Sequence, residues 1–317
     1  MQEIQAGIHQ LADAEYHADP APQPSLSSTL ARVVLNQSPL HAWCQHPRLN
    51  PAHEPVEKKT FDVGRAAHRA VLGAGGEYVT LPEDLLASNG AASTKAAKEF
   101  IEDARAHGQT PLKSAEVAQI EAMAVKVHDR LDQLRVWLDT DRSETVALAR
   151  LDGIWCRAMV DNAPGDPAMP LWDFKTTIDA SPEHCQRAVL NYGYDVQAAH
   201  YNETWKAATG EDRAFRFIFQ EKTAPFEVCV VELDNDALAM ARKKVRRARE
   251  IWRHCLASGH WPGYPTGIHM VSLPSWYHER WLERESAEAE FRHRTGHDIL
   301  DQARRWQAPT QFAGAIK

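Results

Sequence analysis

Three residues near the middle of the chain have the types and the spacing that metal-assisted hydrolysis requires. Asp161 ends one segment with β-strand character, and Asp173 and Lys175 stand two residues apart in another. Because side chains alternate between the faces of a strand, we expect Asp173 and Lys175 to point the same way and Phe174 into the opposite layer. Two carboxylates can hold a hard divalent cation, and the ammonium beside them can orient or activate water. The pattern indicates phosphodiester hydrolysis, and Glu144 is a further acid that could join the site.

The elements expected to position these residues follow the order βββαββα. Asp152-Gly153 is typical of a tight turn between the first two strands, and Ser181-Pro182 is typical of the start of a helix. The expected strands are residues 144–150, 154–160, 171–175, 215–220 and 226–233, and the expected helices run from Ser181 to about Ala208 and over residues 234–258. This order predicts an α/β (α+β) fold with a central mixed β-sheet flanked by helices.

The part of the chain before these strands has a helical pattern. Helices are expected from Ser27 or Ser28, from near Phe61, and on either side of Pro111. Three parts are therefore expected: residues 1–140, mainly helical; residues 141–260, the catalytic core; and residues 261–317, an extension with a mobile end.

Composition indicates an ordinary globular protein rather than one that coats nucleic acid through its overall charge. The 317 residues are 44% hydrophobic and 25% charged, with a net charge of −7, so DNA binding would need a local basic track. The five cysteines are scattered and include no Cys-x-x-Cys pair, so we expect neither a structural zinc nor an iron–sulfur cluster. The sequence shows no basic leader and no apolar segment of bilayer length, and we expect a cytoplasmic protein without membrane contact.

The order of hairpin, acid, loop, Asp-x-Lys and helix resembles the PD-(D/E)xK nuclease superfamily. The resemblance is carried by Asp161 and by Asp173-Phe174-Lys175, although Val160 stands where the name of the superfamily places proline. The resemblance implies the restriction-endonuclease-like fold of these nucleases and a site that uses Mg²⁺, with Mn²⁺ as a substitute.

Two further elements resemble the RecB-type branch of these nucleases. Gln197 and Tyr201 are spaced as in its Q-x-x-x-Y element, and Gly64 and His68 are spaced as in its G-x-x-x-H element. A finer resemblance, over roughly residues 15–265, is to the exonuclease VIII (RecE-type) family and its phage-encoded RecB-like relatives. That finer resemblance is carried by Tyr16-His17, Ser38-Pro39 and Trp261-Pro262-Gly263-Tyr264.

The resemblance implies a deoxyribonuclease that degrades linear double-stranded DNA from its ends in the 5′ to 3′ direction. It also implies a role in phage or prophage recombination beside a single-strand annealing protein, and a homo-oligomer such as a ring. The implied metal ligands are His68, Asp161, Asp173 and the backbone carbonyl of Phe174, with Glu144 as a possible addition, and the implied catalytic set is Asp161, Asp173, Lys175, Gln197 and Tyr201.

Each of these residues also has a structural explanation that the sequence leaves open. The acid–lysine pair could be a plain surface ion pair, and His68 could bond to a backbone carbonyl. Gln197 and Tyr201 could serve packing alone, and Glu144 could be an exposed charge at the end of a strand. For the whole protein, an endonuclease of the same superfamily and a non-catalytic DNA-binding or host-interaction module with the same fold remain alternatives.

A basic helix near the end of the expected core could contact DNA. Arg242, Arg246, Arg249 and Arg253 are three or four residues apart, which places them along one stripe that could follow a phosphate backbone. A solvated helix face is the alternative explanation of such a run.

Overall fold

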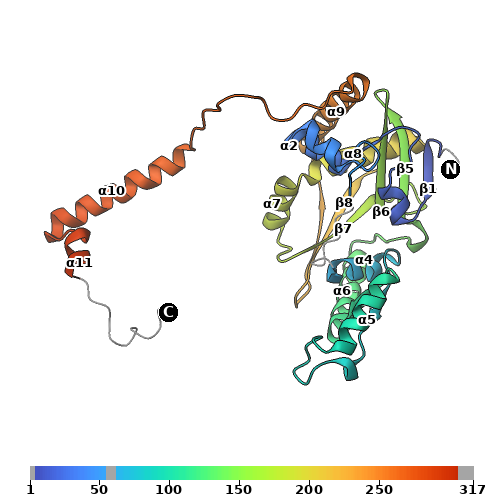
Figure 1. Cartoon of the computed structure of the whole chain (residues 1–317), viewed down its shortest axis with the longest axis horizontal. Coiled ribbons are helices and arrows are strands. Elements are labelled where there is room, and N and C mark those ends of the chain that lie inside the picture. The colour runs from blue at the N-terminus through green and yellow to red at the C-terminus, as the bar shows by residue number, and fades with distance from the viewer. Residues whose placement is uncertain (1–3, 55–61, 306–317) are drawn as a thin grey trace. The chain divides into compact units, whose positions relative to one another are not determined.

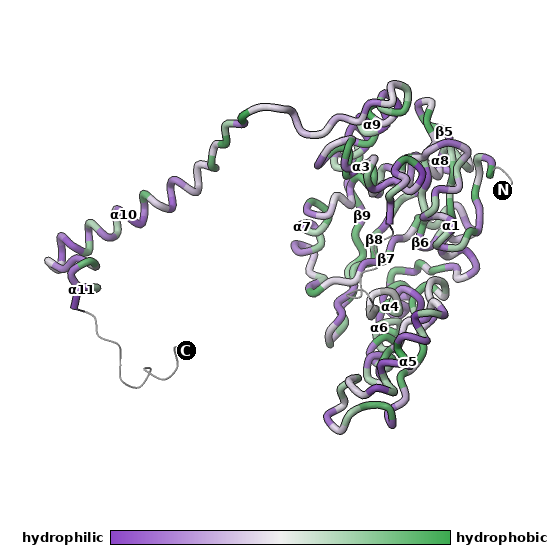
Figure 2. Tube along the Cα trace, in the orientation of Figure 1, coloured by the Kyte–Doolittle hydropathy of each residue, from purple (hydrophilic) through white to green (hydrophobic). Residues whose placement is uncertain are grey.

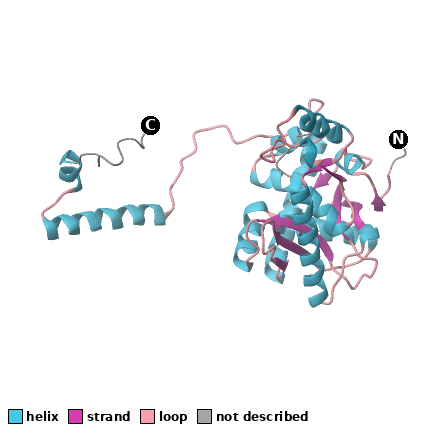
Figure 3. Cartoon of the chain, turned by 90° about the horizontal axis from the view of Figure 1, so that it is seen from below, coloured by secondary structure: helices cyan, strands magenta, loops and turns pink. Residues whose placement is uncertain are grey.

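The computed structural model describes residues 4–54 and 62–305, and the chain divides into two compact units, Met1–Tyr264 and Pro265–Lys317. The first unit holds a mixed β-sheet of seven strands, and its helices lie on both faces of this sheet (Figure 1 and Figure 3). The expected α/β fold with a central mixed sheet flanked by helices is confirmed. Within the described ranges, no helix is both long enough and apolar enough to cross a bilayer.

The sheet follows the order β1-β5-β6-β7-β8-β9, and β2 pairs with β6 outside this path. The strands are β1 Gly7–Gln10, β2 Leu26–Ser27, β5 Ser143–Leu151, β6 Ile154–Asn162, β7 Leu171–Thr177, β8 Phe215–Glu221 and β9 Val228–Glu232. The pairs β7–β8 and β2–β6 are parallel, and the other pairs are antiparallel. The N-terminal part thus contributes β1 and β2 to the sheet, which the sequence pattern did not indicate.

The strands that carry the acids are joined by a hairpin and then separate. Asp152 and Gly153 connect β5 and β6 with φ angles of 51° and 85°, as a type I′ turn requires at its two central positions. The described residues pair β6 with β7 only at Asn162↔Trp172. Asp161 and Asp173 are the next residues along the two strands, so both acids lie where the strands begin to separate.

Two groups of helices cover the sheet. The helices are α1 Asp13–His17, α2 Ser28–Asn36, α3 Pro39–Gln45, α4 Asp62–Leu72, α5 Lys95–Ala106, α6 Ser114–Gln133, α7 Pro182–Tyr192, α8 Tyr194–Thr209 and α9 Asn235–Ser258. Trp172 and Phe174 on β7 pack against apolar residues of α4 and α6, whereas Leu171 on the same strand faces the cluster formed with α7 and α8. A small parallel sheet of β3 Tyr78–Thr80 and β4 Thr110–Leu112 accompanies α4 and α5.

The single helix expected from Ser181 to about Ala208 is in fact two helices, α7 and α8. Gly193 takes a left-handed conformation with φ 65° and ends α7, which glycine adopts without steric cost. A Cβ atom at this position would lie 2.8 Å from Cδ of Arg32. The expectation of one continuous helix was therefore wrong. Apolar periodicity did not reveal the break at Gly193, where the close approach of Arg32 on α2 leaves no room for a side chain.

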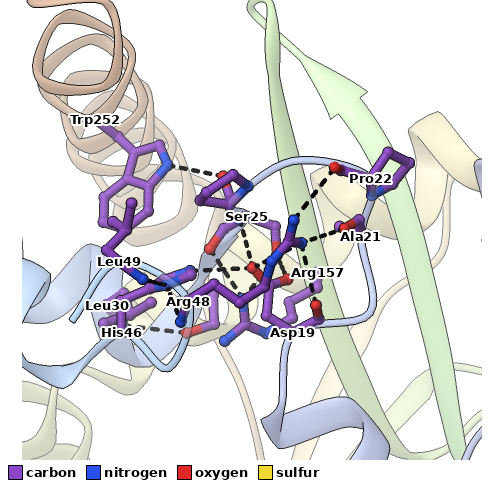
Figure 4. A network of polar contacts seen from close by, with 12 residues as sticks. Asp19, Ala21, Pro22, Ser25, Leu30, His46, Arg48, Leu49, Arg157 and Trp252 are labelled. Atoms are coloured by element: carbon purple, nitrogen blue, oxygen red, sulfur yellow. Dashed lines mark hydrogen bonds and ion pairs between the residues drawn. The ribbon is translucent and has the colours of Figure 1, made fainter. Parts of the chain in front are cut away.

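A buried polar network fixes the chain just before β2 and α2 (Figure 4). Asp19 is 4% exposed, and its Oδ1 accepts a hydrogen bond from Ser25 Oγ at 2.5 Å and lies 3.0 Å from Arg157 Nη1. Its Oδ2 accepts from the Ser25 N–H at 2.9 Å and lies 3.1 Å from His46 Nε2. Arg48 donates to the backbone carbonyl of Asp19 at 3.3 Å. Every oxygen of this carboxylate therefore has partners, and the network holds the start of α2 against β6.

The second unit contains α10 Ser275–Thr295 and α11 Ile299–Arg305 among its described residues. Trp276, Tyr277 and Trp281 on α10 are about half exposed. These aromatic side chains therefore do not form part of a buried core within the described chain.

Candidate functional site

Asp173 and Lys175 on β7 meet on one face of the sheet, as strand alternation predicts. Lys175 Nζ lies 2.5 Å from Asp173 Oδ2, and Asp173 is only 1% exposed. The pair is therefore not the surface ion pair that remained as an alternative. The neighbouring Phe174 points to the opposite layer, where it packs against α4 and α6.

Asp161 on β6 joins this pair across the point where the strands separate. Its Oδ2 accepts a hydrogen bond of 2.7 Å from the backbone N–H of Phe174 and lies 3.3 Å from His68 Nε2. Since the Phe174 N–H is fixed by the strand, the Asp161 carboxylate is held against β7. The structure thus brings together residues that are nearly 100 positions apart in the sequence.

His68 lies between two acids. Its Nδ1 is 3.9 Å from Glu144 Oε1 on β5, on the side opposite to Asp161. Glu144 has a positive φ of 52°, and a Cβ added to Gly75 would lie 3.1 Å from its Oε1. The glycine after α4 therefore leaves the space that this carboxylate occupies. Glu144 thus contacts the site through His68, and the metal-ligand roles of both residues stay predictions.

Gln197 on α8 contacts the central acid directly. Its Nε2 donates a hydrogen bond of 2.5 Å to Asp173 Oδ1, which fixes the orientation of this carboxylate. Tyr201, one helical turn further on, has a different environment. It is 8% exposed, and its ring packs edge-on to Phe215 at 5.7 Å. Tyr201 therefore packs in the core behind Gln197, and the described hydrogen bonds do not join it to either aspartate.

The sequence analysis missed one residue of this site, Tyr194. Lys175 Nζ lies 5.0 Å from the centre of the Tyr194 ring, within the range of a cation–π contact. Tyr194 is the first residue of α8, directly after the break at Gly193. Gly193 was the one signal in the sequence that could have pointed to Tyr194, because a glycine can end a helix.

The electrostatics of the site show acids that are crowded together. Burial, and then the neighbouring Asp161 charge, raise the pKa of Asp173 to about 6 although Lys175 opposes the shift. Burial also acts to raise the pKa of Asp161, but His68, Lys175 and the Phe174 N–H together hold it below its usual value. The pKa of Glu144 is raised, chiefly by burial. Asp173 is therefore the acid whose negative charge is least well compensated.

The basic groups respond to the same acids. Burial would lower the pKa of His68, but the carboxylates of Asp161 and Glu144 outweigh it and raise the pKa. The pKa of Lys175 is raised by Asp173 and Asp161 in spite of burial. The positive charges of the His68 imidazolium and the Lys175 ammonium thus compensate the negative charge of the carboxylates. A bound cation could provide this compensation instead.

The donor atoms fit a hard divalent cation. Three carboxylates and one imidazole converge on the site, and oxygen-rich donor sets suit Mg²⁺ or Mn²⁺. Asp173 Oδ2 is buried and lies 2.5 Å from the Lys175 ammonium, a cation that a metal ion could replace as the partner of this oxygen. Among the described residues, no group of three or more His, Cys, Asp and Glu side chains is arranged to hold a metal ion. His68 and Lys175 instead contact the acids directly.

The basic stripe expected on α9 is wrong at Arg249. Arg249 is 4% exposed, and its guanidinium is held by Asp152 Oδ2 at 2.6 Å and by Glu203 Oε2 at 2.5 Å. It therefore acts as a structural link between α9, α8 and the β5–β6 turn. Arg253 is exposed and donates to the Asp152 carbonyl at 3.2 Å.

Two other arginines of the expected stripe remain available to solvent. Arg242 and Arg246 are exposed, while the buried face of α9 is formed by Ala241, Val245, Ala248 and Trp252. Hydrophilic and hydrophobic segments alternate along this helix (Figure 2). The helix is thus amphipathic, and Arg249 lies too close to its buried face to share the exposed one.

The sequence and the structure are both similar to known nuclease-like proteins. Residues 35–274 match the family described as a PDDEXK-like domain of unknown function (DUF3799). Among curated proteins, none matches the sequence.

Three solved structures are similar to the chain. A putative exonuclease from Eubacterium rectale shares 14% identity over 84% of this chain and 96% of its own, with a TM-score of 0.53. A phage related exonuclease from Haemophilus somnus 129PT shares 12% identity over 62% and 95% of the two chains, with a TM-score of 0.29. LHK-Exo in complex with dAMP shares 13% identity over 64% and 98%, with a TM-score of 0.23. The first of these similarities supports the fold.

Proposed function

The chain belongs to the PDDEXK-like family DUF3799, and from this premise we propose that it is a divalent-metal-dependent deoxyribonuclease. One observation carries the proposal. Side chains from α4, β5, β6 and β7 form one connected cluster of acids and bases, and Gln197 of α8 orients the central acid. The side chains of this cluster are His68, Glu144, Asp161, Asp173 and Lys175.

The residues of the site divide the work of phosphodiester hydrolysis between them. A divalent cation, when bound, would polarise the phosphate and lower the pKa of a coordinated water. Asp161 and Asp173 would hold that cation with His68, and the Phe174 carbonyl and Glu144 could complete its shell. Lys175, steadied by Asp173 and the Tyr194 ring, would donate a hydrogen bond to the attacking water or to the phosphate.

Two groups act through the acids rather than on the substrate. Gln197 holds Asp173 Oδ1 and so selects the direction in which Oδ2 points. The Phe174 N–H does the same for Asp161. Such outer contacts keep metal ligands oriented before the ion binds. We therefore assign Gln197 as a positioning residue, and we assign Tyr201 to the packing that supports it.

We further propose that the enzyme is an exonuclease, with Mg²⁺ as its metal and Mn²⁺ as a substitute, that degrades linear double-stranded DNA in the 5′ to 3′ direction. Its role would be in phage or prophage recombination beside a single-strand annealing protein, and it would act as a homo-oligomer. The motif resemblance to the exonuclease VIII family supports this finer assignment. On α9, Arg242, Arg246 and Arg253 remain candidates for contacts to the DNA backbone.

Digestion of end-labelled linear duplex and closed circular DNA in Mg²⁺, Mn²⁺ or EDTA tests the proposal. We expect loss of the linear substrate only, in either metal but not in EDTA, and no digestion by Asp173→Ala or Lys175→Ala. Asp212→Ala is the matched control, because Asp212 forms a 2.6 Å ion pair with Lys206 on the surface. Cutting of the circle would instead assign an endonuclease, and metal-independent DNA binding without digestion would assign a non-catalytic module.

A further inference from the structure

One arginine beside the site lacks an acidic partner. Arg32 on α2 is half-buried, and it donates to the backbone carbonyl of Tyr192 and, at 3.4 Å, to Thr29 Oγ1. Its Nε is buried without a hydrogen-bond partner. Among the described residues, no carboxylate forms an ion pair with Arg32, although the nearby site contains three. A partly exposed guanidinium without a carboxylate partner is suited to an oxyanion ligand, because its contacts with Tyr192 and Thr29 already orient it.

An exposed aromatic ring lies next to this arginine. Tyr192 ends α7 with 61% of its surface exposed, and its ring centre lies 5.6 Å from that of Tyr194. Tyr194 in turn packs against Phe217 at 5.6 Å. The Tyr192 ring is thus backed by further rings, and its free face is available to a planar partner.

A short series of contacts connects Arg32 and Tyr192 with Lys175 and Asp173. Tyr194 lies under Lys175 at 5.0 Å, and Lys175 contacts Asp173 at 2.5 Å. The charge of Arg32 also acts on the Tyr194 hydroxyl, together with that of Lys175. Gly193, at the helix break between the two tyrosines, packs closely against the Arg32 side chain. Arg32 and Tyr192 are thus linked to Lys175 through Tyr194 by successive contacts.

We propose that Arg32 and Tyr192 form a subsite for the nucleotide adjacent to the scissile phosphate, an inference that rests on the proposed nuclease function. Arg32 binds the backbone phosphate of that nucleotide, and the Tyr192 ring stacks on its base. Because every base presents a π-face, this contact accepts any sequence. The phosphate also supplies a counter-charge to an arginine that has no carboxylate partner among the described residues.

The test compares Arg32→Gln, Arg32→Lys, Tyr192→Ala and Tyr192→Phe with the parent, in duplex binding measured in EDTA at several salt concentrations and in steady-state digestion. We expect Arg32→Gln to flatten the slope of log affinity against log salt by about one phosphate contact, close to 0.7–0.9. Arg32→Lys should keep the parental slope. Tyr192→Ala should weaken binding by about fivefold to a hundredfold, and Tyr192→Phe should not.

In digestion, these losses should appear mainly as a higher KM, because the subsite binds substrate and transition state alike. Arg130→Gln and Tyr264→Ala are matched controls. Arg130 is an arginine that already has an acid, Glu227 at 3.4 Å, and Tyr264 is a tyrosine of similar exposure, 65%. Circular dichroism and thermal unfolding of each variant establish that it is folded.

The outcomes separate the subsite from the nuclease. If the parent digests DNA while Arg32→Gln and Tyr192→Ala keep its affinity, salt slope and KM, the subsite is refuted and the nuclease stands. If the parent neither binds nor digests DNA in any metal, both proposals fail. A loss of kcat with unchanged KM in either variant also refutes the subsite, since it would place the residue in the chemical step.

Discussion

Two buried aspartates show the difference between a carboxylate that stabilises the fold and one that is available for chemistry. Asp19 accepts a hydrogen bond from Ser25 on each oxygen, and His46 and Arg157 are further partners. Asp173 accepts a hydrogen bond from Gln197 on Oδ1, and its Oδ2 has the Lys175 ammonium as an ion-pair partner. The two side chains are equally buried, so burial alone does not distinguish them.

Their pKa values shift in opposite directions for this reason. Burial acts to raise the pKa of both acids. For Asp19, His46, Arg157 and Ser25 outweigh burial and lower the pKa. For Asp173, the Asp161 charge adds to burial and the pKa rises to about 6. A buried acid whose charge is disfavoured by a second acid is the typical signature of a functional site.

The largest expected effect is on activity at Asp173. Asp173→Asn keeps the size of the side chain but removes the charge that would hold a cation, and we expect DNA digestion to fall by about 10³-fold or more. The corresponding Asp19→Asn variant should digest DNA at the parental rate per folded molecule. Initial rates on linear duplex, corrected for the folded fraction, measure both. Comparable losses in the two variants would remove the distinction drawn here.

Stability should respond in the reverse order. Asp19→Asn leaves Arg157 buried without its counter-charge, and loss of one partner of a buried ion pair costs about 3–5 kcal/mol. The free energy of unfolding of Asp173→Asn should lie within about 1 kcal/mol of the parental value or above it, because the fold disfavours the ionised form of this acid. Urea unfolding of the three proteins in EDTA gives the comparison. Strong destabilisation by Asp173→Asn would indicate that Asp173 is a structural acid.

Removal of the hydrogen bond to Asp173 tests how far its orientation matters. Gln197→Met has a similar volume and no donor, so we expect the Mg²⁺ concentration for half-maximal digestion to rise by about 10- to 100-fold. Tyr201→Phe is the matched control one turn along α8, and it should leave this concentration unchanged. An unchanged metal requirement in Gln197→Met would show that packing alone orients the carboxylate.

The smallest expected effect is the contribution of Asp19 to the loss of stability at acid pH. Because the folded-state pKa of Asp19 lies below its ordinary value of about 3.9, its contribution to stability is fully present above pH 4. That contribution is lost as the pH falls through the lower, folded-state value. The free energy of unfolding should therefore fall less steeply below pH 4 in Asp19→Asn than in the parent. Parallel profiles would show that Asp19 is not a source of acid sensitivity.

Much of the fold could be predicted from local pattern. The hairpin turn at Asp152-Gly153 and the helix start after Ser181 are signalled by residue types that few other conformations accept. The break at Gly193 was missed because the apolar periodicity continues across it. The sheet position of β1 was missed because four residues carry little pattern and depend on pairing with β5.

Part of the site was also predictable from local pattern. Asp173 and Lys175 share a strand, so their common face follows from alternation. Arg249 was misjudged because helical spacing places a residue on a face but does not reveal whether that face is covered. The carboxylates of Asp152 and Glu203 that bury its guanidinium come from other elements.

The sequence by itself determined the chemistry that is available to this protein: two aspartates and a lysine at fixed spacing, on strands whose turn residues define their ends. Only the tertiary structure decided that His68 lies between Asp161 and Glu144, that Gln197 contacts Asp173, and that no acid of the described residues pairs with Arg32. The physical reason is one of range. Alternation, turns and caps depend on neighbours along the chain, whereas burial and charge compensation depend on residues brought together by packing.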